Sequence, residues 1–265
     1  MYKRQLAGRD AAIGTLIAET GGQNAMFVDS SALPEQVVKD AAFSAFNSAG
    51  QRCSALRLLC LQTDIADRVI ELLIGHMDEL VVGDPALLET DVGPAIDEEA
   101  RGVLESHVQE MAEKAKVLYR CSLDNGTKSG TFFAPTLIEI DSVDVLEREV
   151  FGPVLHVLRF RSRDLQATID AVNATGYGLT MGLHGRIDGR ARKLVERSGA
   201  GNIYVNRNMI GAVVGVQPFG GRGLSGTGPK AGGPHYLPRF GTEYSVSNNI
   251  AAVGGNASLL SLDND

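Results

Sequence analysis

The sequence has little of what disulfide-rich, secreted or membrane-spanning proteins contain. Its 265 residues include three cysteines, which do not make a disulfide framework, so we expect a reducing cytoplasmic location. No apolar run approaches the roughly 20 residues that a membrane helix needs. The basic residues 1–5 are followed by Gly8-Arg9-Asp10, where a signal peptide would have an apolar stretch. The sequence therefore predicts neither a secretory leader nor a membrane segment.

A dense basic cluster is also missing. The formal net charge is −7, so nucleic acid and anionic membrane surfaces are not expected partners. The five histidines show no metal-ligand spacing with cysteines or carboxylates, and we expect no metal site. Hydrophobic residues make up 44% of the chain, which is typical of a globular protein with a substantial core and one or two domains.

Helix-like and strand-like segments alternate along the chain, which predicts an α/β fold. Asp29-Ser30-Ser31 is expected to cap a helix that starts near Pro34. The predicted helices cover residues 34–50, 63–80, 97–116, 164–174 and 189–197. The predicted strands cover residues 11–18, 56–61, 117–119, 135–140, 154–160, 179–184 and 202–205.

Cys53 and Glu19 are the residues whose chemistry is most informative. A thiol that forms and later releases a thioester needs room around its sulfur and a base that activates water. Gly50 lets the backbone pass tightly beside a substrate, and Glu19 ends a short apolar run, as expected of a strand tip that faces a cleft. Considered alone, a single cysteine such as Cys53 is usually a small buried hydrophobic residue, and a glutamate before two glycines, such as Glu19, is usually a loop residue.

Residues 221–226 formally match the dinucleotide-binding pattern G-x-G-x-x-G. That pattern must open a helix whose N-terminus receives the pyrophosphate. Residues 227–234 contain two prolines and three glycines, which cannot sustain such a helix. We therefore interpret this match as an ordered loop around a ligand.

Four motifs occur in an order that resembles the aldehyde dehydrogenase family. They are Glu19-Thr20-Gly21-Gly22, Gly50-Gln51-Arg52-Cys53, Glu149-Val150-Phe151-Gly152-Pro153 and Gln217-Pro218-Phe219-Gly220-Gly221 with Ser225-Gly226 beyond it. Within this family, residues 211–221 resemble the aldehyde anchor loop of L-glutamate γ-semialdehyde dehydrogenases. Residues 245–260 resemble the C-terminus of bifunctional members that also carry a proline dehydrogenase domain.

The resemblance implies an aldehyde dehydrogenase catalytic domain with a truncated Rossmann-like cofactor domain. Residues 1–21 would be a remnant of the NAD-binding domain, residues 22–221 the catalytic thiol domain, and residues 222–265 a return crossing and C-terminal oligomerisation segment. Because so little chain precedes Glu19, we expect a fragment that begins midway through the cofactor domain. Its expected partners are a small-molecule aldehyde and either further copies of itself or upstream domains of a parent chain.

The resemblance also implies a role for each motif residue. Cys53 would be the nucleophile and Glu19 the general base for hydrolysis of the thioester to L-glutamate. Consecutive backbone N–H groups in a glycine-containing loop cradle an anion well. The implied substrate-binding residues are Ser54, Gly211 and Ala212, for the carboxylate, and Phe219, for the aliphatic middle; the implied cofactor-binding residues are Thr20, Glu149 and Phe151. The cofactor would be NAD, with FAD only in a proline dehydrogenase domain not present in this chain.

Other interpretations stay open at this point. Without the resemblance, the Ser54 hydroxyl is a local backbone hydrogen-bonding group, Phe219 a core aromatic and Glu149 a solvated charge. Phe151 would simply pack beside the turn that follows it. Two alternative functions also remain: an aldehyde dehydrogenase for another substrate, and a non-catalytic piece that lacks cofactor affinity.

Overall fold

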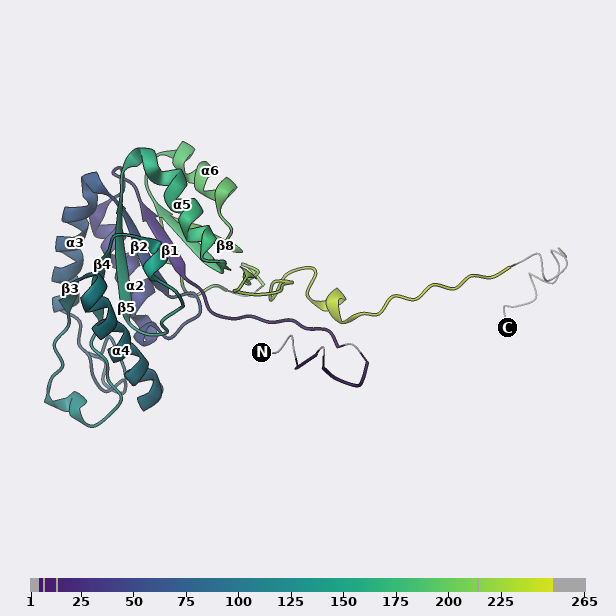
Figure 1. Ribbon diagram of the computed structural model, residues 1–265, viewed down its shortest axis with the longest axis horizontal. Coiled ribbons are helices and arrows are strands. Elements are labelled where there is room, and N and C mark those ends of the chain that lie inside the picture. Colours follow the sequence, from purple (N-terminus) through teal and green to yellow (C-terminus); the bar gives the residue numbers. More distant parts are fainter. Residues whose placement is uncertain (1–4, 7, 13, 214, 250–265) are drawn as a thin grey trace.

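The computed structural model describes residues 5–6, 8–12, 14–213 and 215–249. The part of the resembled tail beyond residue 249 lies outside the described residues. A seven-stranded sheet has the order β3-β4-β5-β2-β1-β7-β8 (Figure 1). All neighbours are parallel except the edge pair β3 and β4. The strands are β1 (Asn24–Val28), β2 (Leu56–Gln62), β3 (Lys116–Arg120), β4 (Thr136–Ile140), β5 (Val154–Phe160), β7 (Thr180–His184) and β8 (Asn202–Val205).

Helices cover both faces of this sheet, as expected where parallel strands are joined by crossovers. The central strand β1 shows the two faces, because its side chains alternate between two apolar clusters. Met26 and Val28 belong to the cluster beneath α2 and α3, whereas Ala25 and Phe27 belong to the one beneath α4, α5 and α6. The helices are α2 (Pro34–Phe46), α3 (Thr63–Asp78), α4 (Glu98–Lys114), α5 (Leu165–Ala174) and α6 (Asp188–Arg197).

The helix starts follow local chemistry, with one correction. Asp97 caps α4 by accepting a hydrogen bond from Ala100 N at 2.8 Å, a type of contact that stabilises a helix by about 1 kcal/mol. Pro34 begins α2 as predicted, but the expected cap by residues 29–31 is wrong. Asp29 instead accepts from Ser31 N at 2.6 Å, and Leu33 occupies the N-cap without a side-chain bond. The helix also ends at Phe46, before the predicted residue 50.

Two strand predictions need correction. No strand covers the described residues between 11 and 18; Glu19 makes only an isolated bridge with Gly226. The strand β1 was not predicted, although it lies at the centre of the sheet. The glycine motif at 221–226 forms the two-residue strand β9 (Arg222–Gly223), which pairs with β6 (Tyr177–Gly178), and opens no helix, as expected.

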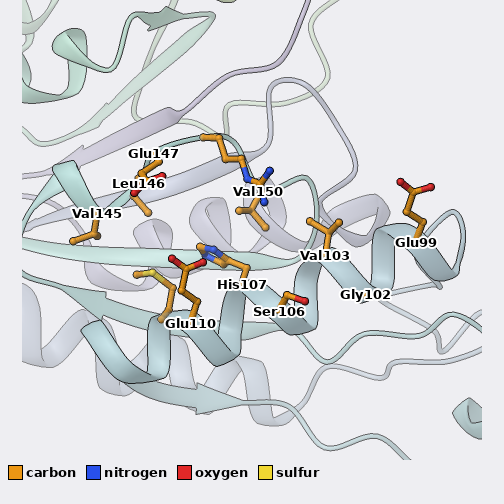
Figure 2. A pocket seen from close by; sticks show the side chains of 12 residues that line it. Glu99, Gly102, Val103, Ser106, His107, Glu110, Val145, Leu146, Glu147 and Val150 are labelled. Atoms are coloured by element: carbon orange, nitrogen blue, oxygen red, sulfur yellow. The ribbon is translucent and has the colours of Figure 1, made fainter.

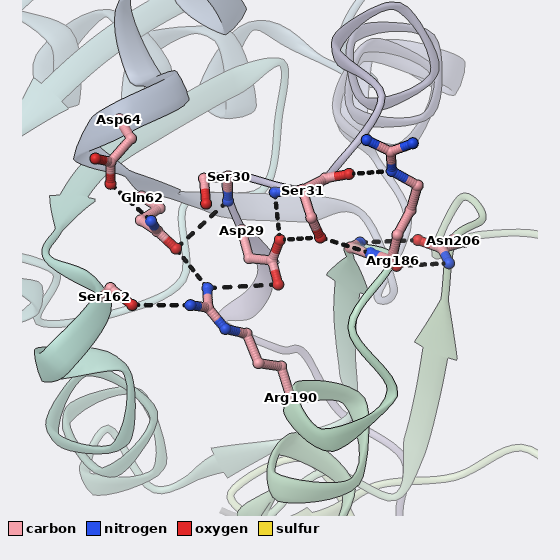
Figure 3. A network of polar contacts seen from close by, with 10 residues as sticks. Asp29, Ser30, Ser31, Gln62, Asp64, Ser162, Arg186, Arg190 and Asn206 are labelled. Carbon is pink, nitrogen blue, oxygen red and sulfur yellow. Dashed lines mark hydrogen bonds and ion pairs between the residues drawn. The ribbon is translucent and has the colours of Figure 1, made fainter.

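The carboxyl ends of the central strands carry a network of mutually bonded polar groups (Figure 3). The buried Asp29, which follows β1, pairs with Arg190 of α6 at 3.4 Å. Arg190 also donates to Gln62 at the end of β2 and to Ser162 after β5. This network joins the ends of three parallel strands. Within the described residues, no helix is both long and apolar enough to cross a lipid bilayer.

Candidate active site

The predicted motif residues meet at the amino ends of the parallel strands. Glu19 precedes β1, Cys53 precedes β2, and residues 149–153 precede β5. Because β1, β2 and β5 are neighbouring parallel strands, the segments that enter them lie at one edge of the sheet. Residues distant in sequence are thereby brought together, as the resemblance requires.

The backbone before Cys53 makes a left-handed turn. Ser48, Ala49 and Gly50 have φ values of 55°, 53° and 62°. Two successive non-glycine residues in this region are rare, because the left-handed conformation costs roughly 1–2 kcal/mol for each of them. A Cβ on Gly50 would lie 2.3 Å from Gly152 O. The sequence prediction that Gly50 permits a close backbone approach is thus correct, but the group it approaches is Gly152 rather than a substrate.

Cys53 is an exposed residue held through its backbone. The buried Asn24 donates from Nδ2 to Cys53 O at 2.7 Å and to Ala55 O at 2.9 Å, while its Oδ1 accepts from Thr180 N at 3.1 Å. Loss of solvation around the sulfur raises the pKa of Cys53, and the Ser54 N–H opposes this increase. The charges of Glu149 and Glu19 raise the Cys53 pKa further, so both carboxylates act on the thiol.

The Glu19 carboxylate points at the two glycines that end the fourth motif. Its Oε2 accepts from Gly221 N at 3.2 Å, and a Cβ on Gly220 would lie 2.9 Å from its Oε1. Partial burial raises the pKa of Glu19, against the opposing effects of the Gly221 N–H and the Lys230 charge. A carboxylate with a raised pKa is a better proton acceptor near neutrality than an ordinary one.

Glu149 joins two other segments of this edge. Its Oε2 accepts from Gly22 N at 3.0 Å, and its Oε1 accepts from the guanidinium of Arg57 at 3.2 Å. Burial raises the pKa of Glu149, and the charge and hydrogen bond of Arg57 oppose that rise. The carboxylate lies so close to Gly21 that a Cβ there would be 1.5 Å from Oε2, which explains why this position is a glycine.

The other predicted cofactor residues lie beside Glu149. The Phe151 ring is half exposed and lines a cavity of about 750 Å³ together with Glu149, Gln51 and Ile96. Thr20 donates from its backbone N to Ser225 O at 3.1 Å, and its hydroxyl donates to a neighbouring backbone carbonyl. The structure therefore places Glu149 and Phe151 at a cavity wall, whereas the Thr20 N–H is bonded to the loop of residues 224–225.

The predicted substrate residues are less closely assembled. Ser54 is buried next to Cys53. Gly211 has a φ of 75°, and a Cβ there would meet no atom of the described residues within 4 Å, so the loop is open toward the described part of the chain at this point. Ala212 is partly exposed. Phe219 is fixed by paired backbone hydrogen bonds with Ala231, at 3.0 and 2.8 Å.

A second cavity, of about 550 Å³, lies between α4 and residues 145–150 (Figure 2). His107 and Glu110 line it from the helix, and Val150 from the facing segment. No predicted site residue lines it. It shares Glu99, Val103 and Arg148 with the lining of the cavity beside Phe151, so the two cavities adjoin each other. Neither lining includes Cys53.

Three residues of this edge were missed by sequence reasoning. Asn24 holds the thiol loop, Arg57 pairs with Glu149, and Lys230 lies near Glu19 and donates to a backbone carbonyl. Of these three, only Arg57 could have been recognised in the sequence, because it is the one charged residue in the apolar stretch of residues 56–61. Among the described residues, no group of three or more His, Cys, Asp or Glu is placed to hold a metal ion.

Comparison with known proteins agrees with this geometry. Residues 3–245 match the aldehyde dehydrogenase family, and the chain therefore belongs to that family. The predictions of family and of an α/β fold are thus confirmed. The role of each named site residue and the domain boundaries are still predictions.

The more specific relatives carry the names PutA and 1-pyrroline-5-carboxylate dehydrogenase. The chain is 56% identical to the bifunctional protein PutA of Escherichia coli (strain K12) over 248 residues, which are 91% of this chain and 19% of that protein. It is 35% identical over 224 residues to a 1-pyrroline-5-carboxylate dehydrogenase of Geobacillus kaustophilus (strain HTA426), covering 84% of this chain and 43% of that one. The chain thus spans about a fifth of the PutA relatives that it matches.

Solved structures give the same grouping. A crystal structure of bifunctional proline utilization A superposes with a TM-score of 0.89 at 55% identity, covering 95% of this chain and 26% of that one. A 1-pyrroline-5-carboxylate dehydrogenase from Thermus with bound NAD superposes with a TM-score of 0.78 at 33% identity, covering 84% and 43%. The regions that match this chain are therefore parts of longer chains.

Proposed function

We propose that this chain carries the thiol and base of an NAD⁺-dependent oxidation of L-glutamate γ-semialdehyde to L-glutamate, the second step of proline catabolism. The observation that carries the proposal is the meeting of Cys53, Glu19 and Glu149 at one edge, where both carboxylates act on the thiol. The relatives named PutA and 1-pyrroline-5-carboxylate dehydrogenase support the choice of substrate.

Cys53 starts the reaction as a thiolate that adds to the aldehyde carbon. Only a minority of an ordinary thiol is ionised near neutrality, because its pKa is about 8.5. The Ser54 and Cys53 N–H groups lie near the sulfur and lower its pKa, against the effect of burial. The same backbone N–H of Cys53 is suited to donate to the oxyanion that develops on the aldehyde oxygen.

The residues beside the thiol fit the nicotinamide end of a cofactor. Glu149 and Phe151 line a cavity of about 750 Å³ that opens next to the thiol loop, and Phe151 offers the face of a half-exposed ring. When bound, NAD⁺ supplies the hydride acceptor that converts the thiol adduct into a thioester. We propose NAD⁺ because the superposed Thermus dehydrogenase has NAD bound.

Glu19 serves the last step, in which water opens the thioester. It takes a proton from water, the resulting hydroxide adds to the thioester carbon, and the Cys53 sulfur leaves as a thiolate. Its raised pKa favours this proton transfer. The Gly221 N–H that donates to Glu19 keeps the carboxylate oriented. The step also requires that a single water molecule fit between this carboxylate and the thioester carbon.

The decisive assay uses the chain with L-glutamate γ-semialdehyde and NAD⁺, and follows NADH formation. We expect turnover by the unmodified chain, none by Cys53→Ala, and turnover close to normal by Cys60→Ala, because the Cys60 thiol is fully buried in β2. Equal turnover by Cys53→Ala would contradict the proposal. Titration calorimetry with NAD⁺ separates the non-catalytic alternative, for which no binding is expected.

Substrate choice is tested at the loop of residues 211–212. Gly211→Asn keeps the left-handed backbone, since asparagine tolerates that conformation, and adds a side chain where nothing lies within 4 Å of a Cβ. We expect a higher KM for the amino-acid aldehyde and an unchanged KM for simple aliphatic aldehydes. An equal change with both substrates would favour an aldehyde dehydrogenase of other specificity.

A further inference from the structure

Arg57 is a charged side chain in a place where charge is costly. The residue is 1% exposed, and it is the largest fully buried side chain of the described residues. A buried guanidinium is tolerated only where hydrogen bonds and an opposite charge replace its solvation. Its Nη1 donates to Gly152 O at 2.9 Å, and its Nη2 lies 3.2 Å from both Arg52 O and Glu149 Oε1.

An irregularity of the sheet aims this side chain at the thiol edge. In the pairing of β1 with β2, Asn24 aligns with Leu56 and Ala25 aligns with Leu58, so Arg57 is an extra residue between the two pairs. Such bulges re-aim a side chain and are frequent next to active sites. The Arg57 carbonyl accepts from His156 Nδ1 at 3.1 Å, which secures the bulge from the neighbouring strand β5.

The groups that bond to Arg57 belong to two of the predicted motifs. One of them, Glu149, also bonds to a residue of a third motif. Arg52 O lies one residue before the thiol, and Glu149 and Gly152 belong to the motif that precedes β5. Through its other oxygen, Glu149 accepts from Gly22 N, in the segment that carries the predicted base. The Phe151 ring stacks against the guanidinium, at 5.2 Å from its centroid.

We propose that Arg57 is a positioning residue for the reaction: it holds Glu149 as a paired carboxylate between the thiol segment and the base segment, and so limits the negative charge that Cys53 experiences. The inference rests on the proposed function in one respect, the assignment of Cys53 as the nucleophile. Its physical content is separate, because the charge on the thiol exists whether or not an aldehyde is oxidised.

The charged groups that act on Cys53 define what each substitution does. Glu149 and Glu19 both raise the pKa of the thiol. Arg57 compensates Glu149 and also interacts directly with Cys53, and Lys230 acts on Glu19. Removing Arg57 leaves an uncompensated carboxylate near the sulfur. Removing the Glu149 charge leaves an uncompensated guanidinium. The two changes therefore shift the Cys53 pKa in opposite directions.

The test is the rate of Cys53 alkylation by iodoacetamide in the whole chain across a pH series, followed by mass spectrometry of the Cys53 peptide. Below the thiol pKa the rate follows the thiolate fraction. We expect Arg57→Met to slow alkylation near neutrality by about threefold or more, which corresponds to about half a pKa unit. Glu149→Gln should accelerate alkylation by a similar factor, and the double variant should return to within about twofold of the original rate.

Arg190→Met is the matched control, because Arg190 also pairs with a buried carboxylate but at the opposite edge of the sheet. Its alkylation rate should be unchanged. A shift in the same direction for Arg57→Met and Glu149→Gln, or an Arg57→Met rate equal to that of the control, would overturn the proposal. If Arg57→Met does not fold, Glu149→Gln decides alone, and an unchanged or slower rate would refute it. No aldehyde or NAD⁺ is needed, so a chain that fails to oxidise L-glutamate γ-semialdehyde still gives a clear result.

Discussion

Polar groups lie at both ends of the parallel strands, but the two arrangements differ. We call the side of the sheet at the carboxyl ends the carboxyl edge, and the side at the amino ends the amino edge. At the carboxyl edge, Asp29, Arg190 and Gln62 bond to one another and to neighbouring backbone groups (Figure 3). At the amino edge, Cys53 is exposed while charged partners lie buried behind it, with Arg57 and Glu149 paired at 3.2 Å. A polar cluster is therefore not by itself the sign of a site.

This arrangement reverses the usual one. In open α/β sheets, ligands generally bind outside the carboxyl ends of the strands, where the strand order reverses. Here β2 and β7 lie on opposite sides of β1, so the strand order reverses at β1. The carboxyl ends at this point are nevertheless occupied by the ion pair of Asp29 with Arg190. The candidate site lies at the amino ends instead. The chemistry of the connecting segments, rather than the strand order, therefore determines where the candidate site lies.

The largest expected effect of a single substitution is at the amino edge. Gly50→Ala would place a Cβ 2.3 Å from Gly152 O at a φ of 62°, which combines a steric clash with a left-handed backbone. We expect a loss of about 3 kcal/mol or more in the free energy of unfolding, measured by urea denaturation. The matched control is Gly75→Ala in α3, where a Cβ meets nothing within 4 Å and a gain of about 0.5–1 kcal/mol is expected. Losses of similar size at both positions would contradict this account of Gly50.

A pair of substitutions separates the two edges directly. Asn24→Ala removes three hydrogen bonds that hold the thiol loop and β7, and Asp29→Ala removes the bonds and ion pair of the opposite network. Each is expected to lower the free energy of unfolding by about 2–3 kcal/mol. Only Asn24→Ala should change the Cys53 alkylation rate, by more than about twofold. If Asp29→Ala changes that rate equally, the two edges are not independent.

A smaller and pH-dependent effect belongs to the amino half of the sheet. Burial lowers the pKa of His156 to about 3, helped by the neighbouring His107. Since the unfolded ring titrates near 6.5, the unfolded state binds the extra proton between these two values. Stability is therefore complete above about pH 6.5 and falls by about 1.4 kcal/mol per unit as the pH decreases through this window.

His156→Gln should remove this dependence. Between about pH 6.5 and pH 5 the original chain is expected to lose about 2 kcal/mol that the variant does not lose. Urea denaturation at both pH values measures the difference. Parallel losses in the two proteins would show that His156 is not the responsible group.

Much of the fold could be predicted from periodicity, since β2, β4, β5, β7 and β8 and the helices α3 to α6 lie close to the predicted segments. The strand β1 was missed because its five residues begin with a polar Asn24, and the polar Gln23 and two glycines precede it. The expected strand at 11–18 failed because an apolar run becomes a strand only beside a partner, and its last residue, Ala18, makes two hydrogen bonds with Thr227 rather than pairing along a neighbouring strand.

The site was predictable in its residue types but not in its internal bonding. The motifs identified Cys53, Glu19 and Glu149 in the sequence. That Glu149 pairs with Arg57, 92 residues earlier, depends on β5 lying beside β2, and strand order is not written in local periodicity. The position of the Glu19 carboxylate likewise depends on Gly221, 202 residues away.

Because the site residues are far apart in the sequence, they are synthesised at different times. The ribosome delivers the thiol before the segment that carries Glu149 and before the loop that receives Glu19. A nascent chain that stops short of residue 149 has Cys53 and Arg57 without Glu149, and one that stops short of residue 221 has Glu19 without the N–H group that orients it. Because non-local pairings form slowly, we expect the reactive centre to be completed late in folding.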